Sequence, residues 1–320
     1  MKGLIIGAGE AGAFRSQGNH VASFNEHPDI ELVGILEVNP TKAAAVVEKY
    51  KTAVFTSIFD ALLAKPDIIV FAINTNIRES YWEEVWKNKA VSTIICEKPL
   101  ADSVSEAERI ISKSAEFNKR LYVNYQRRTN TTYKAIKNEI SAGTRGRIQN
   151  VTVHYTHGLK TNACHWINLA LMIFGKPVWI SSEVSPIPSP YPNDLNFSIL
   201  LGYHQFHMQL IPLMSPQDSF FSGDMILTFE KERIIIPDPT MYNSQHAKRW
   251  RSNNGLLEET NLNFNINKSK NDFRPFLDQV IIEIKRNETS FMKSIDEIQT
   301  LKIIELAERS SLEHRRIDLD

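Results

Sequence analysis

The sequence opens with a glycine-rich loop whose spacing suits the binding of a dinucleotide. Gly7, Gly9 and Gly12 directly follow a short apolar run and precede a helix-length stretch that ends at about His27. In such a loop the first glycine permits a tight turn, the second lets a pyrophosphate approach the backbone, and the third lets helix and strand pack closely. The residues expected to bind the dinucleotide here are those of the loop: Gly7, Gly9, Glu10, Ala11 and Gly12.

Glu37 lies at the end of the second apolar run, about 25 residues after Gly12. A carboxylate at this position can accept both ribose hydroxyls of adenosine, and it repels a 2′-phosphate. The sequence therefore predicts NAD as the cofactor and favours it over NADP. A tight turn without a ligand is the alternative for a lone glycine loop, but the strands and helices around this one favour the dinucleotide.

A Glu97-Lys98-Pro99 segment follows the apolar residues Ile94 to Cys96, where a fifth strand is expected to end. Ligands of open parallel sheets bind at the carboxyl ends of the strands, so we expect Glu97 and Lys98 to border the cofactor. A partly buried lysine can hydrogen-bond a substrate hydroxyl and help to transfer its proton. The alternative is an ordinary exposed lysine, and its location favours the functional interpretation.

The third candidate segment surrounds His165. Asn162 is predicted to cap a helix that runs to Phe174, which places His165 in its first turn and Asn168 on the same face. The helix dipole disfavours a charged imidazole there, and a neutral imidazole can accept a proton. Taken alone, this segment favours the alternative, a histidine that bonds a nearby carbonyl.

The first half of the chain alternates short apolar runs with helix-length segments, which predicts an α/β fold with a parallel sheet covered on both faces. The second half contains runs that alternate apolar with polar residues, as in an antiparallel sheet with one open face. These expected strands are 150–157, 178–184, 195–203, 205–214, 224–229 and 233–236, with loops at 185–194 and 237–254. We expect residues 1–124 to form the dinucleotide-binding domain and residues 125–320 an α+β domain, with the final helix 294–313 a candidate to return to the first.

Composition excludes several classes of protein. The chain has 37 basic and 37 acidic residues, so it lacks the basic excess typical of nucleic-acid binding. No apolar run approaches membrane-spanning length, and no secretory signal opens the chain. Cys96 and Cys164 form no disulfide framework, which favours the cytoplasm. No metal site is expected, because His154 and His157, like His204 and His207, are three apart on strands and face opposite sides.

Taken together, these segments resemble the glucose–fructose oxidoreductase and inositol dehydrogenase family from end to end of the chain. The segments that carry the resemblance occur in the order and spacing of that family: 7–12, Glu37, 97–99, 124–128, 143–148 and the His165 helix. The resemblance implies an N-terminal Rossmann domain, a doubly wound parallel sheet, followed by an α+β domain with a large, mostly antiparallel open-faced sheet. It also implies a nicotinamide cofactor and a sugar-like or cyclitol substrate.

The resemblance further implies roles for individual residues. Lys98 and His165 flank the reacting carbon in such enzymes and are the expected catalytic residues. The turn formed by Asn74, Thr75 and Asn76 matches a cofactor-binding loop of the family. Beside the second domain, Tyr125 is a candidate wall of the substrate pocket. Arg127 or Arg128 is a candidate partner of a substrate phosphate or carboxylate, with a solvated or structural ion pair as the equal alternative.

Two positions depart from the family pattern. The family commonly has an aspartate four residues before this histidine and another three after it, where this chain has Thr161 and Asn168. Neither replacement can raise the basicity of the imidazole as a carboxylate would, although both can hydrogen-bond substrate hydroxyls. This indicates an altered substrate, a preference for reduction, or a protein that no longer catalyses.

The predicted function is hydride transfer between a nicotinamide and a secondary alcohol or ketone of a sugar, cyclitol or sugar derivative. Lys98, Tyr125, Arg127, Thr161, His165 and Asn168 are the expected substrate-binding residues. Two alternatives stay open: a cofactor-binding sensor or structural relative without turnover, and cofactor-recycling epimerase or glycosidase chemistry on the same fold. An open sheet face favours a homodimer or homotetramer.

Overall fold

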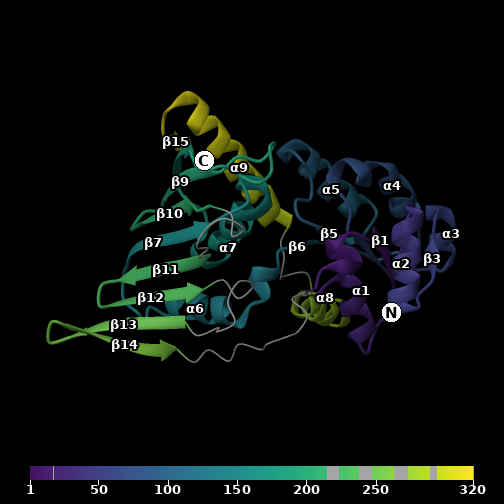
Figure 1. Ribbon diagram of the computed structural model, residues 1–320, viewed down its shortest axis with the longest axis horizontal. Coiled ribbons are helices and arrows are strands. Elements are labelled where there is room, and N and C mark those ends of the chain that lie inside the picture. Colours follow the sequence, from purple (N-terminus) through teal and green to yellow (C-terminus); the bar gives the residue numbers. More distant parts are fainter. Residues whose placement is uncertain (17, 215–222, 238–246, 263–272, 289–293, 320) are drawn as a thin grey trace. The chain divides into compact units, whose positions relative to one another are not determined.

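The computed structural model describes residues 1–16, 18–214, 223–237, 247–262, 273–288 and 294–319 (Figure 1). The chain forms two compact units. Unit 1 consists of residues 1–129 and 268–298, and unit 2 of residues 130–267 and 299–320. Unit 1 therefore takes up a second, later stretch of the chain after unit 2 has begun.

Unit 1 is built on a parallel sheet with the strand order β3-β2-β1-β4-β5-β6. The strands are β1 Lys2–Ile6, β2 Glu31–Leu36, β3 Val54–Phe55, β4 Ile68–Phe71, β5 Thr93–Glu97 and β6 Arg120–Asn124. Every residue of β4 is buried, as expected for a strand with helices on both faces of its sheet. The order reverses between β1 and β4, and ligands of such sheets bind where the order reverses. The predicted doubly wound sheet is confirmed.

The helices of unit 1 show ordinary amphipathic and capping signals. In α5, Ala107, Ile110 and Ser114 are buried at helical spacing, and the Ser103 hydroxyl accepts the Glu106 N–H at the amino terminus. The helices of this unit are α1 His20–Glu26, α2 Pro40–Tyr50, α3 Ile58–Leu63, α4 Thr75–Lys87, α5 Val104–Glu116 and α8 Arg274–Arg286, with the short turns η1 Glu10–Phe14 and η2 Gln126–Thr129.

The expectation of one continuous helix from the glycine loop to His27 is wrong. The loop leads into the five-residue π-helix η1, and α1 starts only at His20. Gly18, with a φ of 119°, and Asn19 separate the two segments. The Asn19 side chain accepts the Ala22 N–H at 2.9 Å and so caps a new helix.

Unit 2 contains a nine-stranded sheet within the described residues, with the order β14-β13-β12-β11-β7-β10-β9-β8-β15. β7 and β10 pair in parallel, and the other described pairs are antiparallel. The strands are β7 Ile148–Tyr155, β8 Trp179–Val184, β9 Phe197–Gly202, β10 His207–Pro212, β11 Asp224–Phe229, β12 Glu232–Pro237, β13 Ala247–Asn253, β14 Leu256–Leu262 and β15 Ile317–Asp318. The predicted large, mostly antiparallel sheet is confirmed.

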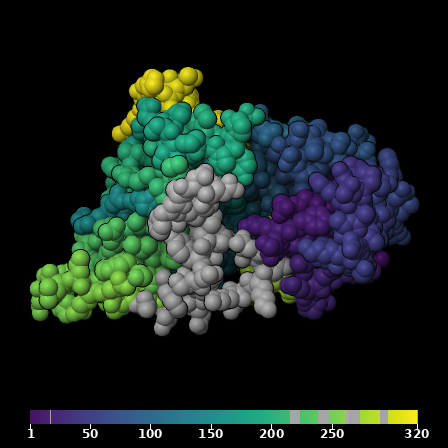
Figure 2. All heavy atoms as spheres, viewed as in Figure 1, coloured from purple at the N-terminus to yellow at the C-terminus, as the bar shows by residue number. Residues whose placement is uncertain are grey.

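The prediction of a loop over residues 237–254 is wrong for residues 247–253, because these form β13. Residues 238–246 lie outside the described residues. β13 pairs with β12 on one side and, through a tight hairpin, with β14 on the other, and these pairings define a strand whose own residues alternate weakly. Together β13 and β14 form a projecting arm of unit 2 (Figures 1 and 2).

Three helices accompany this sheet: α6 Thr131–Ser141, α7 Cys164–Phe174, which follows the π-helix η3 Leu159–Ala163, and α9 Ser294–Glu313, which begins in unit 1 and continues in unit 2. The α9 segment in unit 2 is bonded to β8. The hydroxyls of Ser310 and Ser311 accept the N–H groups of Ser182 and Val184, each at 3.0 Å. Within the described residues, no helix is both long and apolar enough to cross a membrane.

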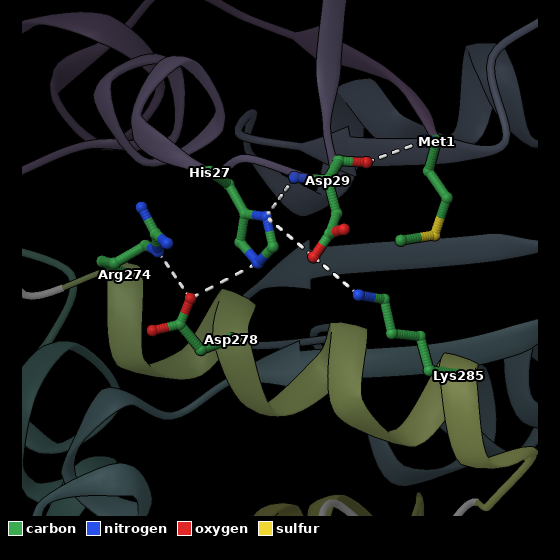
Figure 3. Close-up of polar contacts among 6 residues, drawn as sticks. All are labelled: Met1, His27, Asp29, Arg274, Asp278 and Lys285. Atoms are coloured by element: carbon green, nitrogen blue, oxygen red, sulfur yellow. Dashed lines mark hydrogen bonds and ion pairs between the residues drawn. The ribbon is translucent and has the colours of Figure 1, made fainter.

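A polar cluster connects α8 to the first part of unit 1 (Figure 3). The buried imidazole of His27 lies 3.4 Å from an Asp278 carboxylate oxygen, and its Nδ1 accepts the Asp29 N–H at 3.1 Å. Lys285 donates to the Asp29 carboxylate at 2.7 Å. Burial lowers the pKa of His27, and the neighbouring charge of Arg274 acts in the same direction, against the carboxylates of Asp278 and Asp29.

We expect this cluster to make unit 1 less stable at mildly acidic pH. Because the pKa of His27 is lower in the folded protein than its usual 6.5, the unfolded chain binds more protons, and stability falls as the pH drops from about 6.5 through the folded-state pKa. His27→Gln removes this titration and costs about 1 kcal/mol at pH 7.5 through weaker hydrogen bonds. Urea unfolding at several pH values measures both effects. If the free energy of unfolding changes with pH between about 5 and 7 as steeply in the variant as in the wild type, His27 is not the group responsible.

Candidate functional site

The glycine loop lies at the carboxyl end of β1, beside the end of β4. Gly7 has a φ of 100°, and a Cβ there would lie 2.8 Å from the Ala72 carbonyl oxygen. A Cβ on Gly12 would lie 2.1 Å from the Gly7 oxygen, so this close approach requires glycine. By contrast, a Cβ on Gly9 would meet no atom within 4 Å. The loop is therefore closed on its sheet side and open at Gly9, which fits the approach of a pyrophosphate.

Glu37 is held next to this loop. Its carboxylate accepts the Ala8 N–H and the Asn39 N–H, each at 2.8 Å, through different oxygens. The side chain is buried, and the two backbone bonds fix its orientation at the end of β2. A carboxylate fixed there can receive ribose hydroxyls through its remaining lone pairs.

The Asn74-Thr75-Asn76 segment is the start of α4 rather than a turn before a later helix. Asn74 occupies the N-cap position, and Thr75 and Asn76 form the first turn. The Thr75 hydroxyl donates to the Asp102 carboxylate at 2.8 Å, which ties this helix start to the segment after β5.

Lys98 directly follows β5 and is half-buried, and its peptide bond to Pro99 is cis. The preceding Glu97 is bonded through one oxygen to His20 Nε2 and to Asn124 Nδ2, each at 2.7 Å. Burial alone would raise the pKa of Glu97, but these hydrogen bonds and the charge of Lys98 outweigh it and lower the pKa. Glu97 thus ties the end of β5 to α1 and β6.

His20 was not predicted as part of this site. Its buried ring bonds Glu97 and lies edge-on against Phe273, with 4.7 Å between ring centroids. The Asn19 cap that precedes it is the signal that could have placed it at a helix start. No local pattern could have paired it with Glu97, 77 residues away.

Tyr125 and Arg127 also belong to unit 1, directly after β6. Tyr125 is buried, and its hydroxyl is close enough to the carboxyl group of Glu297 to act toward lowering the pKa of that group. Arg127 is half-buried in η2. Its neighbour Arg128 forms an ion pair with Asp296 at 2.8 Å. For Arg128, one of the two arginines considered for substrate binding, the structure thus shows the alternative, a structural ion pair.

His165 is the second residue of α7 in unit 2 and is half-buried. The expectation that Asn162 caps this helix is wrong, because Ala163 holds the N-cap position. Gly158, with a φ of 86°, starts the π-helix η3, so Asn162 already lies inside a helical turn. His165 nevertheless falls in the first turn of α7, as expected.

Thr161 and Asn168 lie on either side of His165. The Asp194 carboxylate accepts the N–H groups of Lys160 and Thr161 at 2.8 and 2.7 Å, and so holds the turn that precedes α7. Asn168 is fully buried and donates to the Thr300 hydroxyl at 2.9 Å, while its Oδ1 accepts no hydrogen bond from the described residues. Asp194 was missed because it ends an expected loop and meets this turn only in the folded unit.

Each unit thus gathers part of the predicted site. Unit 1 holds the glycine loop, Glu37, the start of α4, Glu97, Lys98, Tyr125 and Arg127; unit 2 holds Thr161, His165 and Asn168. Among the residues that the structure describes, no group of three or more His, Cys, Asp or Glu side chains could hold a metal ion.

Residues 1–125 match the family model described as an oxidoreductase family with an NAD-binding Rossmann fold. Inositol 2-dehydrogenase from Rubrobacter xylanophilus is 24% identical over 216 residues, which are 65% of this chain and 59% of the relative. The chain spans less than two thirds of the length of the curated relatives that it matches, with 41% and 44% for two others.

Two solved structures share the fold over nearly their full lengths. The aldose-aldose oxidoreductase from Caulobacter crescentus, complexed with glycerol, has a TM-score of 0.83 at 18% identity, covering 100% of this chain and 99% of the other. The WlbA dehydrogenase from Bordetella pertussis, in complex with NADH and UDP-GlcNAcA, has a TM-score of 0.75 at 18% identity over 100% and 99% of the two chains. At these identities the likeness establishes the fold.

Proposed function

We propose, since residues 1–125 match the model of an oxidoreductase family with an NAD-binding Rossmann fold, that this chain is an NAD-dependent dehydrogenase or reductase acting on a secondary alcohol or ketone of a sugar-like molecule. The observation that carries the proposal is the carboxyl edge of the unit 1 sheet. There a glycine loop that is open at Gly9 lies next to the fixed carboxylate of Glu37, and Lys98 directly follows β5.

The residues present fit a bound NAD. Gly7, Gly9, Glu10, Ala11 and Gly12 would hold its pyrophosphate, Glu37 its adenosine ribose, and Asn74, Thr75, Asn76, Glu97 and Lys98 its nicotinamide half. The fit rests on the open space at Gly9 and on the remaining lone pairs of Glu37. Bound NAD would supply the hydride acceptor, or NADH the hydride donor.

The protein's own contribution is to hold the substrate and to move one proton. The Lys98 ammonium would hydrogen-bond the substrate oxygen and stabilise negative charge that develops on it. His165, from unit 2, would take the hydroxyl proton in oxidation and return it in reduction. Each of the two side chains is half-buried in its own unit, which leaves part of each accessible to a ligand.

Tyr125, Arg127, Thr161 and Asn168 would complete the substrate site. The buried Oδ1 of Asn168, which accepts no hydrogen bond from the described residues, supports this role for that residue. The relatives named above act on, or were solved with, cyclitols, sugars and sugar nucleotides, as their names state, which supports a substrate rich in hydroxyl groups. With Thr161 and Asn168 in place of carboxylates, we propose a substrate that differs from theirs.

A direct test combines binding with turnover. Isothermal titration of the purified chain with NAD and NADH measures cofactor binding. Absorbance at 340 nm then follows NADH while sugars, cyclitols, sugar phosphates and nucleotide sugars are screened in both directions. Absence of binding to either form of the cofactor would contradict the proposal.

A second candidate is a cofactor-binding relative without turnover, which the neutral Thr161 and Asn168 favour. This candidate predicts NAD binding with no change in NADH absorbance for any ligand that binds. The recycling alternative, an epimerase or glycosidase, would show product formation without net NADH, and deuterium from the substrate carbon would return to the product.

Cofactor choice provides a further prediction. We expect Glu37→Gln to lower the ratio of NAD to NADP affinity by about thirtyfold, because it removes a charge repulsion with the 2′-phosphate worth about 2 kcal/mol. Glutamine keeps an oxygen that can accept the Ala8 N–H, so the loop should stay in place. Titration of the variant with both cofactors measures the ratio. Equal NAD preference in variant and wild type would place Glu37 away from the ribose.

We further propose a cytoplasmic homodimer or homotetramer. Both cysteines are free, which suits a reducing compartment. In unit 2, Leu200, Ile226 and Ile235 form part of one cross-strand row and are only partly covered, and Leu257 near the tip of the β13–β14 arm is 75% exposed. Apolar surface of this kind supports association between copies, and light scattering of the purified protein would show a monomer if the proposal is wrong.

A further inference from the structure

The backbone around Lys98 is held by a buried arginine with no role in the chemistry proposed above. Arg78, on α4, is only 2% exposed. Its guanidinium donates to four backbone carbonyls: Ile73 at 3.0 Å, Glu97 at 2.7 Å, Pro99 at 2.6 Å and Leu100 at 3.1 Å. Three of these carbonyls belong to the four-residue segment that contains Lys98. The five donors of a guanidinium in a rigid plane suit such a cluster of acceptors.

A buried carboxyl group holds the same segment through its N–H. Glu297, in the first turn of α9, is 2% exposed, and its Oε1 accepts the Leu100 N–H at 2.9 Å. The Tyr125 hydroxyl lies close to the same carboxyl group. Leu100 therefore has its N–H fixed by Glu297 and its carbonyl fixed by Arg78.

The electrostatics of Glu297 agree with this geometry. Burial raises its pKa, while the Leu100 N–H, the Tyr125 hydroxyl and the charges of Arg78 and Lys98 act in the other direction. A protonated carboxyl group keeps a carbonyl oxygen that can accept the Leu100 N–H, so the contact does not depend on the ionisation of Glu297.

The arrangement differs from an ordinary buried ion pair. Within the described residues, Arg78 hydrogen-bonds to four backbone carbonyls, and Glu297 Oε1 accepts a backbone N–H. Both side chains thus hydrogen-bond to the backbone of the 97–100 turn. A turn held from both its carbonyls and its N–H has little freedom to move the side chain that it carries.

We propose that Arg78 and Glu297 are positioning residues for Lys98, which fix the 97–100 segment so that the Lys98 ammonium stays at the reacting oxygen. The inference rests on the proposed role of Lys98 in hydride transfer. Reaction rates depend steeply on such placement, and a displacement of about 1 Å can cost about a hundredfold in rate. The proposal extends the site beyond the residues that touch substrate or cofactor, to one helix before β5 and one far later in the chain.

Matched variants separate this role from general stability. Glu297→Ala removes the acceptor for the Leu100 N–H, whereas Glu297→Gln keeps an oxygen in the same place. Arg78→Met removes all four bonds, and Arg78→Lys retains the charge but cannot reach four carbonyls at once. Arg109→Met is the control, because it breaks an exposed ion pair with Glu79 in the same unit.

The first measurement does not require turnover. Competitive labelling with acetic anhydride, followed by mass spectrometry, compares the reactivity of Lys98 with that of the exposed Lys51. We expect Arg78→Met and Glu297→Ala to change the relative labelling of Lys98 by about threefold or more, as the segment opens locally. Glu297→Gln and Arg109→Met should stay near the wild-type value. If Arg78→Met does not fold, Arg78→Lys and the two Glu297 variants still test whether these residues position Lys98.

The second measurement uses the substrate found in the screen. Arg78→Met and Glu297→Ala should lower kcat by about a hundredfold while the affinity for NAD falls much less, because the glycine loop and Glu37, which would hold the pyrophosphate and the adenosine ribose, are not displaced. Wild-type labelling of Lys98 in both Glu297→Ala and Arg78→Lys would overturn the inference, and so would equal effects of Glu297→Ala and Glu297→Gln. If the wild-type chain binds no NAD, the proposed function is wrong. The labelling result would still show whether Arg78 and Glu297 hold the segment around Lys98.

Discussion

Lys98→Met is expected to lower kcat by about a thousandfold while leaving NAD binding nearly intact. The methionine side chain fills a similar volume but can neither donate a hydrogen bond nor carry charge. The substrate oxygen would then develop negative charge with no ammonium beside it. Steady-state kinetics with the substrate identified in the screen, together with calorimetric titration of NAD, measures the two quantities separately.

Lys87→Met serves as the control for this substitution, because Lys87 is an exposed lysine on α4 whose ion pair with Glu83 lies on the surface. It should leave kcat unchanged. His165→Asn tests the partner residue and should lower kcat by about a hundredfold or more, since the proton acceptor is lost. Full turnover in either Lys98→Met or His165→Asn would show that the assigned chemistry is wrong.

Gly9→Val is expected to weaken NAD binding by about a hundredfold or more without unfolding the protein. The backbone of Gly9 has a φ of −76°, which any residue can adopt, and a Cβ there meets no atom within 4 Å. The free protein therefore has room for the new side chain. The pyrophosphate would need the same space, so the substitution should block the cofactor alone.

Gly12→Ala provides the contrasting case in the same loop. Its Cβ would lie 2.1 Å from the Gly7 oxygen, so we expect a lower melting temperature as well as lost NAD binding. Thermal unfolding and NAD titration on both variants distinguish the two effects. If Gly9→Val binds NAD like the wild type, the pyrophosphate does not lie on this loop.

Several features of unit 1 were predictable from local sequence because each depends on residues close together in the chain. Gly7, Gly9 and Gly12 encode a backbone conformation by their lack of side chains. The fully buried β4 follows from an apolar run of strand length. The apolar run of β5 alone places Lys98 directly after that strand. It therefore also places Lys98 at the carboxyl edge of the sheet.

Other features have local signals that the alternation of apolar and polar residues does not contain. β13 was not predicted because its own residues alternate weakly, although Asn254 and Gly255, both with positive φ, form the two-residue turn that pairs it with β14. The break after η1 was missed because the glycine loop is usually followed by an uninterrupted helix, and the cap at Asn19 was not weighed against that expectation.

The sequence by itself thus determined the fold class, the cofactor loop and the candidate catalytic types, since these follow from periodicity, glycine spacing and residue chemistry. Only the tertiary structure decided what surrounds Lys98. Arg78 is about 20 residues from its carbonyl partners Glu97 to Leu100, and Glu297 is 197 residues from Leu100. A buried charge is tolerated only where the fold supplies its hydrogen-bond partners, and those partners are chosen by packing across the chain rather than by neighbours along it.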